Sequence, residues 1–140
     1  MKTVAELTPF QTAIVRKGAA PDRLAKRVAA DPELLPQVLA GLRADQPRIK
    51  YGCSRVLRLV SQKHPAVLYP RFDFFAGLLD SDNNFLKWDA ARIIAHLAAA
   101  DSRGRFEPML TRYLRPINGP VMITAANLIR NAATIALARP

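Results

Sequence analysis

Apolar residues recur along most of the chain at spacings of three and four residues, which is typical of amphipathic helices. One such stripe consists of Ile49, Cys53, Val56, Leu57 and Val60, and a second of Leu86, Ala90, Ile93, Ile94 and Leu97. Runs of alternating apolar and polar residues between turn dipeptides, the mark of β-strands, do not stand out. The pattern therefore predicts an all-α fold.

Prolines and glycines divide this helical pattern into segments. They fall at Asp31-Pro32, Gln46-Pro47, His64-Pro65 and Gly119-Pro120, where they would end helices. The segments between them form three copies of a two-helix unit. The first helices read LLPQVLAGL from Leu34, LYPRFDFFAGLL from Leu68 and FEPMLTRYL from Phe106; the second read RIKYGCSRVLRLV, FLKWDAARIIAHLA and VMITAANLIRNAA. Leu42, Leu78 and Leu114 recur at intervals of 36 residues, and the first two end an identical Ala-Gly-Leu triplet.

Residues 1–30 match the repeat less well. Thr8-Pro9 is typical of a helix N-cap followed by a first-turn proline, and it predicts a helix over 9–17. Ala20-Pro21-Asp22 predicts a second helix that runs to Ala30. We expect one domain over 1–140, with an N-terminal capping pair over 1–30 and repeats over 31–64, 65–101 and 102–140, because neighbouring repeats bury each other's apolar stripes.

The second copy carries a recognisable set of positions. It has Pro70, then Leu78-Leu79-Asp80, then Asp82-Asn83 in the turn, and Leu86-Lys87 and Ala90 opening the second helix. This pattern resembles the HEAT-repeat (armadillo-type α-solenoid) family. The resemblance implies a right-handed α-α superhelix, a HEAT-like solenoid of about three helix pairs plus the capping pair. It also implies that the second helices line a concave surface.

Composition narrows the class of protein further. The chain has 140 residues, of which 50% are hydrophobic and 23% charged, which excludes a disordered tail. Its single cysteine excludes an intramolecular disulfide and a multi-cysteine zinc site, and the N-terminus lacks a signal peptide, so we expect a cytoplasmic protein. Residues 121–138 could pass for a membrane span, but Asn127, Arg130 and Asn131 lie in the middle, so we expect no membrane association.

The charge is strongly basic. Twenty-one Lys and Arg residues against eleven Asp and Glu leave a net charge of +10, which favours an acidic partner. Thirteen of the basic residues and five of the acidic ones lie within residues 1–71. The positive field therefore belongs mainly to the N-terminal half.

Helical spacing predicts which side chains lie opposite the apolar stripes of the second helices. They are Arg48, Tyr51, Arg55, Arg58 and Gln62 in the first copy, Trp88, Asp89, Arg92 and His96 in the second, and Ile123, Thr124, Asn127, Arg130 and Asn131 in the third. In a solenoid of the HEAT type, Tyr51 and Trp88 would share an aromatic row beside a cationic row of Arg55 and Arg92. Arginine forks bind carboxylates and aromatic rings supply anchoring area, so this surface is our candidate binding site.

We therefore predict a non-catalytic protein-protein interaction or scaffold module of the HEAT-repeat type that binds an acidic protein or peptide on its concave face. Nucleic-acid binding through a basic aromatic groove is the alternative. A DNA alkylation-repair-type glycosylase is a third, weaker hypothesis, because only Trp88-Asp89 and the basic groove resemble that class. The plainest interpretation is that these cations only solvate the helices.

The sequence offers little for metal binding or for a reactive cysteine. Neither His64 nor His96 has a second His or Cys at helical spacing, so we expect no metal site and no cofactor. Cys53 lies within an apolar stripe and is expected to be a small core residue. The last helix, 121–138, is apolar on more than one side, which predicts a homo-oligomer formed through the C-terminal repeat.

Overall fold

The computed structural model describes residues 8–16, 20–101, 103–109, 113–114 and 122–138, and the side chains of 122–128 lie outside that description. The chain divides into two compact units, Met1–Val60 and Ser61–Pro140. The described residues form helices, turns and loops and contain no strand, which confirms the predicted all-α class.

The first unit contains α1 (Pro9–Val15), α2 (Pro21–Ala30), the 3-10 turn η1 (Pro32–Leu34), α3 (Leu35–Gly41) and most of α4 (Pro47–Lys63). The predicted cap at Thr8 is confirmed. The Thr8 hydroxyl accepts a hydrogen bond from the Gln11 amide at 3.2 Å, and the Gln11 side chain accepts one from the Thr8 amide at 3.2 Å. This reciprocal capping box fixes where α1 begins.

The core of the first unit forms where α1 and α4 meet and where α3 and α4 meet. The apolar stripe of α4 is buried as predicted, with Cys53, Leu57 and Val60 each 0% exposed. A Cβ atom on Gly52 would overlap Ile14 of α1, so the two helices approach closely there. α3 contributes the buried residues Leu35, Val38, Leu39 and Gly41.

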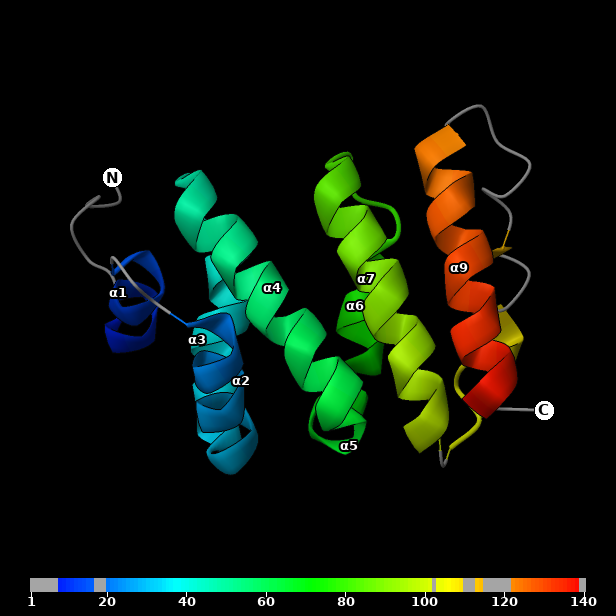
Figure 1. Ribbon diagram of the computed structural model, residues 1–140, viewed down its shortest axis with the longest axis horizontal. Coiled ribbons are helices and arrows are strands. Elements are labelled where there is room, and N and C mark those ends of the chain that lie inside the picture. The colour runs from blue at the N-terminus through cyan, green and yellow to red at the C-terminus, as the bar shows by residue number, and fades with distance from the viewer. Residues whose placement is uncertain (1–7, 17–19, 102, 110–112, 115–121, 139–140) are drawn as a thin grey trace. The chain divides into compact units, whose positions relative to one another are not determined.

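The second unit contains α5 (Pro65–Leu68), η2 (Tyr69–Arg71), α6 (Phe72–Leu78), α7 (Asn84–Leu97), η3 (Ala98–Ala100), η4 (Glu107–Met109) and α9 (Met122–Ala138). α7 packs against both α6 and α9 (Figure 1). Its predicted stripe is buried, and Asn83 caps it by accepting a hydrogen bond from the Leu86 amide at 3.1 Å. Within the predicted helix 106–114, the structure has η4 and a helical Tyr113–Leu114, and residues 110–112 lie outside the described part.

Two sets of elements repeat with a constant offset. η1 and η2 begin at Pro32 and Tyr69, α3 and α6 at Leu35 and Phe72, and α4 and α7 at Pro47 and Asn84, each pair 37 residues apart. The sequence interval of 36, taken from Leu42 and Leu78, is therefore one residue short for these helices. The shift changes which residues are equivalent, and it places the two Ala-Gly-Leu triplets in different environments.

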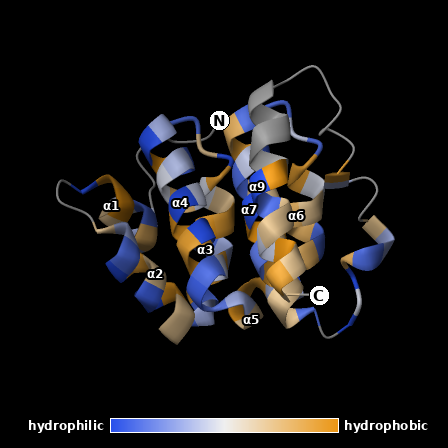
Figure 2. Cartoon of the chain, turned by 45° about the vertical axis from the view of Figure 1, so that its right-hand side comes forward, coloured by the Kyte–Doolittle hydropathy of each residue, from blue (hydrophilic) through white to orange (hydrophobic). Residues whose placement is uncertain are grey.

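Polar and apolar residues share the same helices, as Figure 2 shows for α2 and α3. In α2 the buried residues are Leu24, Ala25 and Val28, whereas Lys26 and Arg27 between them are exposed. Each helix of this kind needs a neighbour to cover its apolar side. No helix within the described residues is long and apolar enough to cross a membrane.

Candidate functional site

α4 presents a basic surface opposite its buried stripe. Arg48, Tyr51 and Arg55 are exposed and Arg58 is half-buried, in agreement with the predicted face. We call these four residues the α4 cationic face. Tyr51 is 38% exposed, so part of its ring is available to a partner while the rest contacts the protein.

The two exposed arginines of this face are held differently. The Arg48 guanidinium donates a hydrogen bond to the Val15 carbonyl at 2.9 Å, which fixes it over the end of α1. Arg55 makes no ion pair with the described residues. Its long side chain can therefore turn toward a ligand, and its planar fork of donors matches a carboxylate in bidentate geometry.

The region around α4 lacks acidic residues altogether. From Gln46 to Phe72 the sequence contains six Lys and Arg residues and no Asp or Glu. Ordinary solvated helices mix both signs, because Glu and Lys four residues apart stabilise each other. On α4 no such pair exists within the helix, so its positive charge is not neutralised along its own length. Counting acidic residues in a sliding window would have identified this region from sequence.

The candidate residues of α7 are less exposed than those of α4. Trp88, Arg92 and His96 are all half-buried. Trp88 packs edge-on against Phe85, with ring centroids 5.4 Å apart, and Phe85 is 61% exposed. Sequence reasoning missed Phe85, although its place three residues before Trp88 puts both rings on one side of the helix.

His96 has a defined partner in the second unit. Its Nδ1 lies 3.0 Å from the hydroxyl oxygen of Ser61, a residue that is 0% exposed. Because Ser61 is buried, this pair does not present a nucleophile to a substrate.

The candidate residues of α9 differ in their exposure. Arg130 is exposed, whereas the side chain of Asn127 lies outside the described residues. Placing Asn131 on the exposed face was wrong, because this residue is only 3% exposed. Among residues 129–138 of α9, the exposed ones are Ile129, Arg130, Ala133, Ala136 and Leu137. The rows that would join Tyr51 with Trp88 and Arg55 with Arg92 stay a prediction, since they connect different units.

Cys53 is a core residue, as predicted. It is 0% exposed, and burial raises the pKa of its thiol from the ordinary 9.0 to about 12. The thiolate, which is the nucleophilic and metal-binding form, is therefore strongly disfavoured. Among the described residues, no three His, Cys, Asp or Glu side chains gather in a group that could hold a metal ion.

Comparison with protein-family models, with curated proteins and with solved structures finds no match to this chain. Its function is therefore inferred from the chemistry of its own surface, above all from the α4 cationic face.

Proposed function

We propose that this chain is a non-catalytic interaction or scaffold module that binds an acidic protein segment through the α4 cationic face. The observation that carries the proposal is that α4 exposes Arg48, Tyr51 and Arg55 within a stretch that contains no carboxylate. Arginine and tyrosine are the side chains enriched where protein interfaces bind most strongly. A HEAT-like superhelix and a cytoplasmic location belong to the same proposal.

The partly exposed ring favours a peptide that combines carboxylates with an apolar anchor. Tyr51 is the only aromatic residue of α4. A single such ring can cover one apolar side chain of a partner. Single-stranded nucleic acid binds best to several rings that stack on successive bases. The single ring therefore favours a peptide over nucleic acid. Nucleic acid is the alternative ligand, and the experiment must distinguish it from the peptide.

Charge reversal of Arg55 tests this proposal directly. Arg55→Glu is expected to weaken binding of a fluorescein-labelled glutamate-rich peptide with a central phenylalanine by about tenfold or more, because one attractive contact becomes repulsive. Fluorescence anisotropy measures the change. The matched control is Arg23→Glu on α2, which makes the same charge change at another exposed position and should alter the affinity less than about threefold at 0.15 M salt, where distant exposed charges are screened.

Two outcomes would count against the acidic-peptide assignment. If Arg55→Glu and Arg23→Glu weaken the peptide equally, net charge and not the α4 cationic face controls binding. If a labelled oligothymidylate binds more tightly than the peptide, with a steep loss of affinity as salt rises, the ligand is nucleic acid.

The exposed side of α9 supports the proposal that two copies associate. Ile129 is 60% exposed and Leu137 87% exposed, and Ala133 and Ala136 lie between them at helical spacing. A second copy would present the same apolar stripe, so a two-fold contact is self-complementary. Sedimentation velocity should show a dimer at high micromolar concentration and a monomer after Leu137→Lys. A monomer at all concentrations would contradict self-association.

A further inference from the structure

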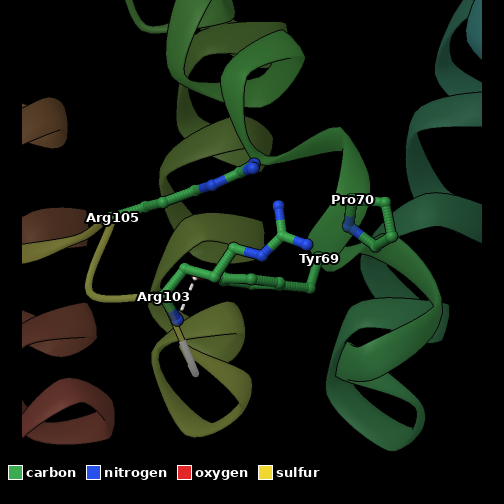
Figure 3. A pocket seen from close by; sticks show the side chains of 4 residues that line it. All are labelled: Tyr69, Pro70, Arg103 and Arg105. Atoms are coloured by element: carbon green, nitrogen blue, oxygen red, sulfur yellow. Dashed lines mark hydrogen bonds between the residues drawn. The ribbon is translucent and has the colours of Figure 1, made fainter.

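A small pocket in the second unit brings two arginines together beside an aromatic ring. Its volume is about 260 Å³, and it is lined by Tyr69, Pro70, Arg103 and Arg105. Figure 3 shows both arginine side chains extending from the loop after η3 toward Tyr69 and Pro70. We call these four residues the arginine pocket.

The backbone of this pocket is fixed by Asp101. Its carboxylate accepts hydrogen bonds from the Tyr69 hydroxyl at 2.5 Å, the Arg105 amide at 2.8 Å and the Phe106 amide at 3.1 Å. The Arg103 amide in turn donates to the Tyr69 hydroxyl at 3.1 Å. Because Tyr69 is only 8% exposed, the loop is tied to a buried residue. The two arginines are therefore presented from a held backbone, which lowers the entropy lost on binding.

The hydrogen bonds that fix this loop involve the backbone amides of the two arginines and not their guanidinium groups. The Asp101 contacts with Arg103 and Arg105 run through the backbone, and Arg105 carries its guanidinium carbon 5.5 Å from the centre of the Tyr69 ring. Neither arginine forms an ion pair with the described residues. Two cations that share one pocket repel each other, and an anion placed between them would relieve that repulsion.

We propose that the arginine pocket binds a phosphoryl group. A phosphate monoester offers three terminal oxygens and close to two negative charges, whereas a carboxylate offers two oxygens and one charge, so the phosphoryl group matches a pair of arginine forks better. Tyr69 and Pro70 add an apolar wall for the organic group that carries the phosphate. At about 260 Å³ the pocket is smaller than the roughly 300–1,000 Å³ typical of drug-sized ligands. This site is independent of the α4 cationic face.

Titration with phenyl phosphate, inorganic phosphate and benzoate tests the proposal, with binding followed by the amide NMR signals of Arg103 and Arg105. We expect phenyl phosphate to bind, inorganic phosphate to bind more weakly, and benzoate to bind at least tenfold more weakly than phenyl phosphate. The double variant Arg103→Gln/Arg105→Gln should lose at least tenfold in affinity. The matched control Arg71→Gln, an exposed arginine that does not line the pocket, should change it less than threefold.

Further variants distinguish a specific site from a general charge effect. Arg103→Lys/Arg105→Lys keeps both charges but removes the planar forks, so it should weaken phenyl phosphate as well. Circular dichroism confirms that each variant is folded. The proposal is overturned if phenyl phosphate does not bind, if the glutamine variant binds as tightly as the original chain, or if benzoate binds equally well. If inorganic phosphate matches phenyl phosphate, the phosphoryl group is still the ligand and its source is free phosphate.

Discussion

Alanine at Gly41 is expected to destabilise the protein by about 1–3 kcal/mol, the usual range for overpacking a core. Gly41 is the last residue of α3 and is buried against α4. A Cβ atom at this position would overlap the sulfur of Cys53, and Ile49 lies close on the same side. Both neighbours belong to the buried stripe of α4, so they have little room to move. Urea denaturation gives the change in the free energy of unfolding.

The matched control is the second Ala-Gly-Leu triplet of the sequence. No atom lies within 4 Å of a Cβ built on Gly77, which is exposed near the end of α6. Gly77→Ala should therefore stabilise the protein by about 0.5–1 kcal/mol, because alanine restricts the unfolded chain and favours the helix. Glycine-to-alanine substitution in two identical triplets is therefore expected to change the free energy of unfolding in opposite directions.

A double substitution locates the cause of the Gly41 effect. Cys53→Ala removes the sulfur that a Cβ on Gly41 would overlap, so Gly41→Ala should be better tolerated in the Cys53→Ala background than in the original chain. Equal destabilisation in the two backgrounds would show that contact with Cys53 is not the cause. A stabilising Gly41→Ala would contradict the close packing of α3 on α4.

Stability is expected to fall as the pH rises above 9, and Cys53 accounts for part of the fall. Burial raises the pKa of this thiol from 9.0 to about 12 in the folded protein. Between these values the unfolded chain has released the proton and the folded protein retains it, so unfolding becomes more favourable with increasing pH. The stability contributed by the neutral thiol is thus complete below pH 9 and is lost progressively toward pH 12. The slope for one such group is roughly 1 kcal/mol per pH unit.

Comparison with Cys53→Ala isolates this effect from other alkaline titrations. Burial also raises the pKa of Tyr113 above its ordinary value, so the variant keeps a pH dependence of its own. Urea denaturation of both proteins between pH 8 and 11 should nevertheless show a steeper loss of stability for the original chain. The extra loss in its free energy of unfolding, relative to the variant, should be about 1 kcal/mol at pH 10 and between about 2 and 3 kcal/mol at pH 11. Parallel curves would contradict the buried state of the thiol.

Local rules predicted most of the helices from sequence. Apolar spacing identified the buried sides of α4 and α7 residue by residue, because those helices are long enough for the 3.6-residue period to be clear. Thr8 and Asn83 marked helix starts, since a capping side chain acts within three residues of itself. Such short-range signals do not depend on how the rest of the chain packs.

Features that depend on packing were not predicted. The shared Ala-Gly-Leu triplet suggested equivalent positions, but the helices repeat at 37 residues, so Gly41 is buried and Gly77 exposed. Asn131 follows exposed Arg130 in the sequence, but it is only 3% exposed, which its polar side chain did not indicate. The arginine pocket joins Tyr69 to a loop more than thirty residues further along the chain, a pairing that helical periodicity cannot indicate.

The most direct test of the proposed function is residue-resolved NMR mapping of the glutamate-rich peptide on the isotope-labelled chain. We expect the largest amide shifts at Tyr51, Arg55 and Arg58, and their disappearance in Arg55→Glu. Shifts that cluster elsewhere, or that persist unchanged in Arg55→Glu, would contradict the assignment of the α4 cationic face as the binding surface.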